Sequence, residues 1–137
     1  MKSTKTILTG AALSLVAGSA FAGSHMASEM TIVSWGGAYS KSQLNAYHDP
    51  YSEMTGVTIL NDDSSSTAVA KLRAMNEAGN ITWDVVDVEA APAMQLCDEG
   101  LAMVIDPDTM LAAAPDGTPA SEDFGDMLVS ECFMPQI

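Results

Sequence analysis

The stretch from Met30 to Tyr39, which reads MTIVSWGGAY, decides the fold class of this chain. Its first half is a run of β-branched and other apolar residues, which is typical of a strand, and Gly36 and Gly37 break that run into a turn. Residues 40–55 then place apolar side chains three and four positions apart, which predicts a helix. A strand, a glycine turn and a helix in this order predict the first half of a βαβ unit and therefore an α/β fold.

The same alternation of short apolar runs and amphipathic stretches continues along the chain, and it predicts a mainly parallel sheet flanked by helices. We expect the first helix to begin at a capping box of Ser40 and Gln43, to be kinked at Pro50, and the second helix to be capped by Ser66. The expected strands are residues 30–34, 57–60, 83–88 and 101–105, with a further strand starting in 129–134; the expected helices are 40–55, 66–78 and 92–99, and 112–121 is expected to be a loop.

The start of the chain predicts export. Residues 1–22 carry Lys2 and Lys5, then an apolar run, then small residues, which is the pattern of a secretory signal peptide. Residues 23–29 are expected to be a linker that resembles a cloning scar, and 30–137 to be an incomplete first lobe of a binding domain. The chain has 137 residues, which suits one domain and is short for two lobes.

We expect the exported protein to be a free periplasmic protein. The apolar run of the signal is too short to span a bilayer, and no later stretch approaches the roughly 20 apolar residues that a span requires. A lipid anchor needs a cysteine at the cleavage point, whereas the first cysteine of the chain is Cys97.

The composition is strongly acidic. Eighteen Asp and Glu stand against five Lys and Arg, for a formal charge of −13. This balance argues against binding nucleic acid or an anionic membrane by electrostatic attraction. Two explanations remain open: the charge accommodates a cationic ligand, or it keeps an exported protein soluble.

Candidate ligand-binding residues follow the first strand. Open α/β sheets bind ligands in a crevice at the carboxyl ends of their strands, which is where Trp35, Gly36, Gly37 and Tyr39 stand. Aromatic faces attract ammonium groups, so Trp35 and Tyr39 suit an amine ligand. The alternative is that Trp35 only packs over the end of the sheet.

The second and third strands end at the same edge and add four further candidates. Ser64 and Ser65 follow the second strand, and their hydroxyls either face the crevice or only cap the next helix. Asp87 and Glu89 close the third strand and point to one side of it, where a carboxylate can pair with a ligand ammonium. The alternative for both acids is that they are solvated at the edge of a loop.

The motifs of enzymes are missing. The pair Gly36-Gly37 lacks the further glycines of a dinucleotide fingerprint, and no nucleophile elbow or Cys-His pattern is present. His48 stands alone, and His25 falls in the scar-like segment, so no metal signature forms. We therefore expect a protein that is not an enzyme and holds no cofactor or metal.

Cys97 and Cys132 are the two cysteines of the chain. In an oxidising compartment an even pair is most simply interpreted as one disulfide, which would tie the third helix to the last segment. Two buried free thiols are the alternative.

Several runs together resemble a known family, the extracellular solute-binding proteins of the spermidine/putrescine ABC-transporter type. The runs that carry the resemblance are TIVSWGGAY at 31–39, SEMTGV at 52–57, DVV at 84–86, and CDEGL at 97–101 followed by Asp106. The resemblance covers residues 30–106, with a weaker extension to Cys132.

The resemblance implies a type II periplasmic-binding architecture, in which two α/β lobes close on a ligand and no chemistry is performed. This chain would be the first lobe, with the second lobe absent, and Trp35, Tyr39 and Asp87 would bind the ligand by position. The implied function is to capture a polyamine in the periplasm, as a monomer, and to deliver it to the permease subunits of an ABC importer. Another small solute such as iron, thiamine or an amino acid-like compound is the alternative, and an exported α/β hydrolase is the remaining one.

Overall fold

The computed structural model describes residues 28–135, which are built around a three-stranded parallel sheet. The expected signal peptide and most of the linker lie outside the described residues. The elements are, in chain order, β1 (Glu29–Val33), α1 (Gly37–Gln43), the π-helical turn η1 (Leu44–His48), α2 (Asp49–Thr55), β2 (Thr58–Asp62), the 3-10 turn η2 (Ser65–Thr67), α3 (Ala68–Glu77), β3 (Val85–Val86), α4 (Ala90–Asp98), α5 (Pro107–Met110), α6 (Ala120–Phe124) and the 3-10 turn η3 (Gly125–Met127).

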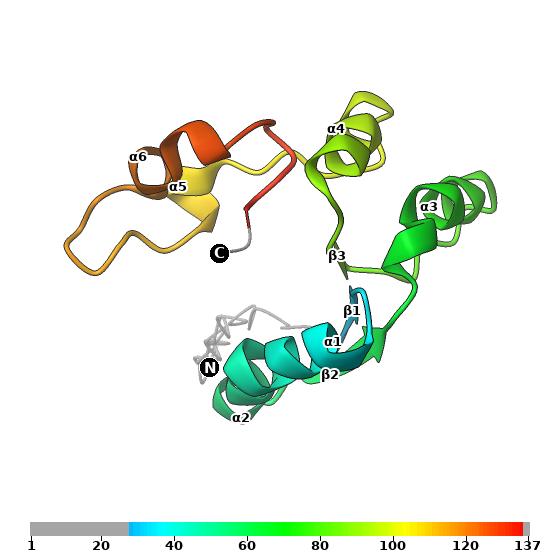
Figure 1. The fold of residues 1–137 in the computed structure, drawn as a ribbon, viewed down its shortest axis with the longest axis horizontal. Helices are drawn as coiled ribbons and strands as arrows, with labels where there is room; N and C mark the ends of the chain where they lie inside the picture. Colours follow the sequence, from blue (N-terminus) through cyan, green and yellow to red (C-terminus); the bar gives the residue numbers. More distant parts are fainter. Residues whose placement is uncertain (1–27, 136–137) are drawn as a thin grey trace, which may run out of the picture.

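The strand order is β2-β1-β3, with β1 in the centre and parallel to both neighbours. The chain leaves β1 through α1 and α2 to reach β2 on one side, and returns through α3 to reach β3 on the other side. Because right-handed crossovers in opposite directions place their helices on opposite faces, α1–α2 and α3 lie on different sides of the sheet (Figure 1). The predicted α/β class with a parallel sheet is confirmed.

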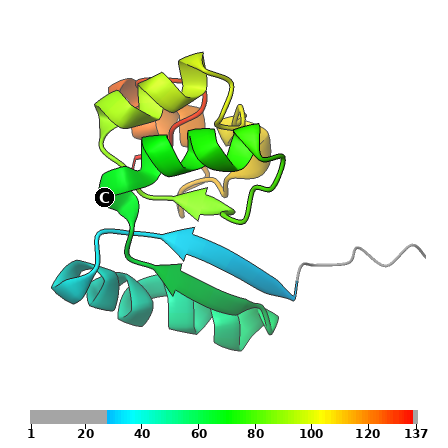
Figure 2. The same cartoon turned by 90° about the vertical axis from the view of Figure 1, so that its right-hand side faces the viewer.

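The core lies on the α3 and α4 side of the sheet (Figure 2). It is a cluster of Val33, Ala68, Leu72, Trp83 and Leu96, of which Val33 is fully buried. Val33 comes from β1, Ala68 and Leu72 from α3 and Leu96 from α4, while Trp83 precedes β3. Helices α3 and α4 thus cover one face of the sheet, and α1 and α2 lie on the other.

Asp62 at the end of β2 anchors the indole of Trp83, whose Nε1 donates to Asp62 Oδ2 over 3.2 Å. A hydrogen bond from the Ser64 side chain, followed by the charge of Lys71 and the bond from Trp83, holds the pKa of Asp62 below its ordinary 3.8, against the opposing effect of burial. A carboxylate with a lowered folded-state pKa contributes stability that is present above the unfolded pKa and is lost as the pH falls through the folded pKa.

The free energy of unfolding is therefore expected to decrease as the pH falls below about 4, and Asp62→Asn is expected to make this decrease shallower. Urea unfolding at a series of pH values measures both slopes. Asp123→Asn, which replaces an exposed acid on α6 far from the Asp62 network, is the matched control and should leave the slope unchanged. Equal slopes for wild type and Asp62→Asn would contradict the role given to Asp62.

The first helix differs from the prediction at its start. It begins at Gly37, so Ser40 lies inside it, where the Ser40 hydroxyl accepts the Gly36 N–H over 2.8 Å. The helical path continues through η1 into α2, and Pro50 falls in the first turn of α2. The predicted capping box was wrong, because the helix begins three residues before Ser40. The kink at Pro50 stays a prediction.

The expected strands after β3 do not form. Residues 101–105 and 129–134 approach each other through a hydrogen bond from Ile105 N–H to the Glu131 carbonyl, and one such bond is not a ladder. The third strand is reduced to β3, because Asp84 contacts β1 partly through its side chain, whose Oδ2 accepts the Thr31 N–H.

Two smaller corrections concern helix starts. Ser66 is exposed and does not cap α3; Thr67 precedes this helix and donates its hydroxyl to the Ser64 carbonyl. The expected loop 112–121 is interrupted at Ala120, where α6 begins. In the part of the chain described here, no helix combines the length and apolar character needed to cross a membrane.

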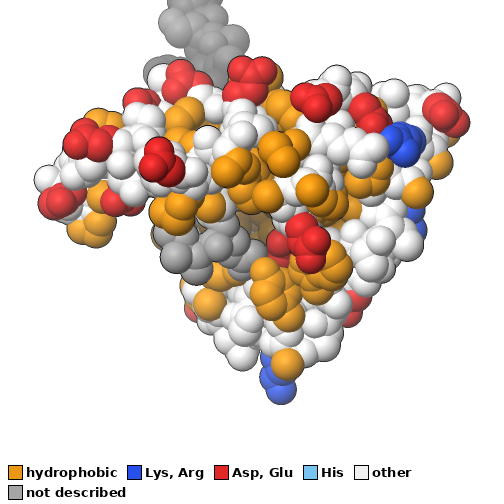
Figure 3. All heavy atoms as spheres, turned by 45° about the horizontal axis from the view of Figure 1, so that its top comes forward, with side chains coloured by type: hydrophobic (Ala, Val, Ile, Leu, Met, Phe, Trp, Pro, Cys, Tyr) orange, Lys and Arg blue, Asp and Glu red, His pale blue; other side chains and the backbone are white. Residues whose placement is uncertain are grey.

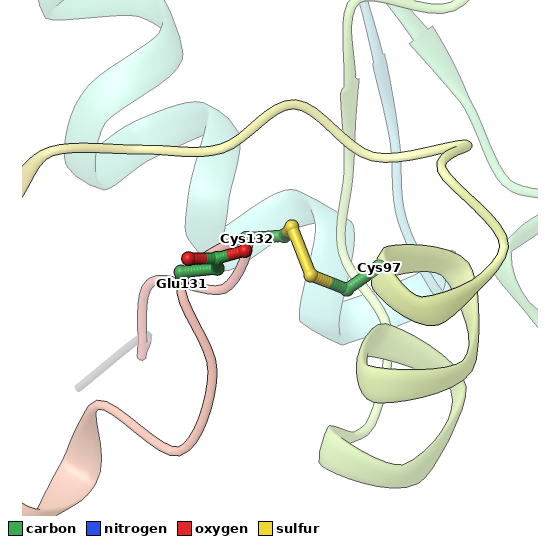
Figure 4. A group of neighbouring side chains, drawn as sticks. All are labelled: Cys97, Glu131 and Cys132. Atoms are coloured by element: carbon green, nitrogen blue, oxygen red, sulfur yellow. A yellow bond between two sulfur atoms is a disulfide. The ribbon is translucent and has the colours of Figure 1, made fainter.

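Residues 101–135 form a C-terminal arm that carries α5 and α6 and returns to α4. The predicted disulfide between Cys97 and Cys132 is confirmed, with the two Cα atoms 5.6 Å apart. Glu131 lies beside this bond (Figure 4), but the two sulfurs are bonded to each other and offer no thiolate to a metal. The disulfide thus joins the end of the arm to α4.

Candidate ligand-binding site

A cavity of about 1160 Å³ borders the sheet and reaches the core, because Leu72, Trp83 and Leu96 of the core cluster are among its lining residues. Its walls come from the helical path α1–η1–α2, from the sheet and the segment after β3, and from the C-terminal arm. Figure 3 shows hydrophobic side chains gathered around a hollow, with acidic side chains at its rim. Among the described residues that line it there is no lysine or arginine.

One wall of the cavity is aromatic. Trp35 and Tyr39 line it with 43% of each side chain exposed, and Tyr47 and Tyr51 continue the same wall. In a regular α-helix each four-residue step overshoots a full turn by about 40°, so the side chains would drift away from one face. The turn η1 is wider, because its hydrogen bonds span five residues, and this offsets the drift. The π-helical turn therefore keeps the tyrosines on the cavity side.

Asp87 and Glu89, which follow β3, also line the cavity. Val86 and Val88 line the cavity too and also pack against the core. The backbone of Asp87 is held on both sides: its N–H donates to the Val33 carbonyl over 2.9 Å, and its carbonyl accepts the hydroxyl of Ser65. Asp87 is half-buried, whereas Glu89 is exposed.

Behind the Asp87 carboxylate lies a small buried network. Gln43 Nε2 donates to Asp87 Oδ2 over 2.9 Å, and Ser34 Oγ lies 2.5 Å from Gln43 Oε1 and 3.2 Å from Asp87 Oδ2. Ser34 and Gln43 are 2% and 3% exposed, so their polar groups depend on these partners. The network joins the end of β1, the last turn of α1 and the end of β3.

The structure brings Trp35, Tyr39, Asp87 and Glu89 of the predicted site residues together on one cavity. Among the lining residues the other four are not found, and their visible roles are structural. Gly36 and Gly37 have φ values of +81° and +61°, and a Cβ on Gly36 would lie 3.1 Å from the Asp63 side chain.

Ser64 and Ser65 support the site from behind. Ser65 is 4% exposed and donates its hydroxyl to the Asp87 carbonyl, while the Ser64 hydroxyl stabilises the Asp62 carboxylate. A direct role of either serine in ligand binding stays a prediction.

Sequence reasoning did not assign to the site four residues that line the cavity: Gln43, Tyr47, His48 and Tyr51. The sequence predicts Gln43 in a capping box and Tyr47 and Tyr51 only as part of the helix over 40–55. The four-residue spacing from Tyr39 through Gln43 and Tyr47 to Tyr51 was the available signal. His48 is buried at the end of η1, and its Nδ1 lies 2.9 Å from Asn61 Oδ1 in β2. Local sequence does not indicate this contact between η1 and β2.

Comparison with known proteins identifies the family. The family described as bacterial extracellular solute-binding protein matches residues 46–135. The gamma-aminobutyric acid-binding protein of Pseudomonas aeruginosa is 36% identical over 78 residues, which are 57% of this chain and 22% of that protein.

The structure of the PBP AgtB from A. tumefaciens R10 in complex with agropinic acid is similar to this fold. It has 36% sequence identity and a TM-score of 0.58 over 65% of this chain and 27% of that chain. This chain thus spans about a quarter of the length of these relatives. The family match covers more than half of the chain, and the parallel sheet with its cavity is that of a periplasmic binding protein, so this chain belongs to the bacterial extracellular solute-binding proteins.

Proposed function

We propose that this chain is part of the substrate-binding component of an ABC importer, and that it captures a small solute through a protonated amine. The observation that carries the proposal is the composition of the cavity: aromatic residues and acidic residues line it together, and its described lining residues include no lysine or arginine. Aromatic rings and carboxylates both attract an ammonium group, and a basic side chain would repel it.

Polyamines such as putrescine and spermidine are the first candidates. They carry amines joined by apolar chains, which suits a cavity whose charged groups are set in aliphatic and aromatic surface. The alternative explanation for the net charge of −13, a soluble surface, does not explain why carboxylates lie in the cavity.

An amino acid-like amine is the second candidate, and one observation favours it. The relative from Pseudomonas aeruginosa carries the name of a gamma-aminobutyric acid-binding protein. 4-Aminobutyrate has a terminal amine like putrescine and a carboxylate in place of the second amine. The described cavity offers no cation to that carboxylate, so other parts of the full chain would have to bind it.

The same proposal includes location and partners. The family and the expected signal at residues 1–22 support a periplasmic protein that delivers its solute to the permease subunits of an importer. Such a protein binds and releases its ligand unchanged, so it performs no catalysis. We propose that it acts as a monomer.

Titration of the mature full chain with putrescine, spermidine and 4-aminobutyrate, by calorimetry and thermal shift, tests the proposal. A ligand that binds the folded state raises the unfolding free energy by about 2.7 kcal/mol at one hundred times its Kd. 1,4-Butanediol and butyrate are the controls that lack an amine, and they should have no effect.

Two variants connect the binding to the cavity. Asp87→Asn is expected to weaken amine binding by about 10- to 150-fold, the size of a hydrogen bond to a charged group, and Trp35→Ala by about 2- to 30-fold. If none of the three amines binds, the amine assignment is wrong, although membership of the family stands.

A further inference from the structure

Three buried or half-buried polar groups form a chain that ends on the Asp87 carboxylate. It runs from the Ser34 hydroxyl, at the end of β1, through the Gln43 amide, in the last turn of α1, to Asp87 after β3. The sequence separations are 9 and 44 residues, so the tertiary fold alone brings these groups together.

The hydrogen bonds among Ser34, Gln43 and Asp87 have one consistent arrangement of donors and acceptors. Gln43 Nε2 donates to Asp87 Oδ2 over 2.9 Å, which turns Gln43 Oε1 toward Ser34 Oγ. A serine hydroxyl has a single proton, and the 2.5 Å contact with Oε1 receives it in preference to the 3.2 Å contact with Asp87. Ser34 thus sets the orientation of the amide, and the amide holds the carboxylate.

The remaining contacts of Asp87 fix its backbone, through the Val33 carbonyl and the Ser65 hydroxyl. Within residues 28–135 the Asp87 side chain is bonded to Ser34 and Gln43 through Oδ2, and Asp87 lines the cavity. We infer that Ser34 and Gln43 are positioning residues, which hold Oδ2 so that Oδ1 of Asp87 faces the cavity and accepts the amine of the ligand. This inference rests on the proposed function.

The chemistry of the donor supports this role. A lysine or arginine behind Asp87 would orient the carboxylate but would also neutralise it and compete with the ammonium of the ligand. A neutral amide donates a hydrogen bond and leaves the negative charge for the ligand. Since the described cavity lining has no lysine or arginine, the charge of Asp87 has no partner of either kind there. The network therefore selects for a cation.

If Ser34 and Gln43 only stabilised the fold, any buried polar residue of α1 would affect ligand binding in the same way. Ser40 is the matched control for this alternative. Ser40 is also a buried polar residue of α1, 6% exposed, but its hydroxyl contacts Asp63 Oδ1 and the Gly36 N–H and does not contact Asp87. Ser40→Ala removes a buried hydrogen-bonding network of similar size from the same helix.

The experiment is a double-mutant cycle on the mature full chain, with putrescine, spermidine and 4-aminobutyrate as the calorimetric probes. Gln43→Leu is expected to weaken the binding of the amine that wild type binds by about tenfold, and Ser34→Ala by about threefold. Ser40→Ala should change it by less than twofold. In an Asp87→Asn background, Gln43→Leu should cause no further loss, because the two residues act through one carboxylate.

The outcomes separate the two proposals. If wild type binds an amine and Gln43→Leu binds it equally well, the positioning role is wrong and the proposed function stands. An equal loss from Gln43→Leu with and without Asp87→Asn also overturns it, because the effect would then be structural. If Gln43→Leu does not fold, Ser34→Ala in the same cycle decides. Failure of wild type to bind any of these amines overturns the proposed function, and the positioning role with it.

Discussion

Trp83→Ala is expected to lower the free energy of unfolding by about 3–5 kcal/mol, the usual cost of deleting a large core side chain. Trp83 is 7% exposed and packs in the cluster with Val33 and Leu72. Its loss would also remove the hydrogen bond to Asp62 and the contact with Lys71, whose Nζ lies 5.2 Å from the ring centre. Urea unfolding followed by circular dichroism measures the change.

The second tryptophan of the chain is the matched control. Trp35 is 43% exposed on the cavity wall, so Trp35→Ala is expected to change the free energy of unfolding by about 0.5 kcal/mol or less. The two variants should separate stability from binding, since Trp35→Ala is expected to weaken amine binding. If Trp35→Ala destabilised the protein as much as Trp83→Ala, Trp35 would be a packing residue, which is the alternative that the sequence left open.

Removal of the disulfide is the other change with a large expected effect. The bond between Cys97 and Cys132 closes a loop of 35 residues, and the chain-entropy model gives a loss of about 4 kcal/mol when it is removed. The double variant Cys97→Ser with Cys132→Ser should unfold at a correspondingly lower urea concentration. Wild type treated with a reductant is the independent check and should match the double variant.

The loss should be concentrated in the C-terminal arm. Within the described residues, α5 contacts α6 and α6 contacts η3, while the arm makes few contacts with the sheet. Amide hydrogen exchange in residues 103–135 is therefore expected to accelerate strongly without the disulfide, with little change in α3. Because the arm forms one wall of the cavity, its release should also weaken ligand binding. Equal protection of the arm with and without the disulfide would contradict this view.

The elements that sequence predicted well are those with a local signal. β1 and β2 each lie within two residues of the predicted segments, because an apolar run bounded by turn residues is a short-range pattern. Gly36 and Gly37 were recognised as a turn, and both take positive φ values that other residues avoid. The disulfide was also predictable, since it depends on the count of cysteines and the compartment.

The errors arose where an element depends on a distant partner. Residues 101–105 have the composition of a strand but meet residues 129–134 through too few hydrogen bonds to form one. Gln43 has the spacing of a capping residue, yet its amide is buried against Asp87, 44 residues further along the chain. No local sequence pattern distinguishes a glutamine that caps a helix from one that binds a distant carboxylate.

The sequence by itself determined the α/β class, the order of the first elements, the cysteine pair, and the residues Trp35, Tyr39 and Asp87 as neighbours at one edge of the sheet. Periodicity and the geometry of parallel strands are enough for this, because strand ends align whatever the packing is. Only the tertiary structure decided that Ser34 and Gln43 hold the Asp87 carboxylate and that η1 keeps the tyrosines on one wall. Those contacts join segments far apart in sequence, and burial makes their hydrogen bonds obligatory only after the chain has folded.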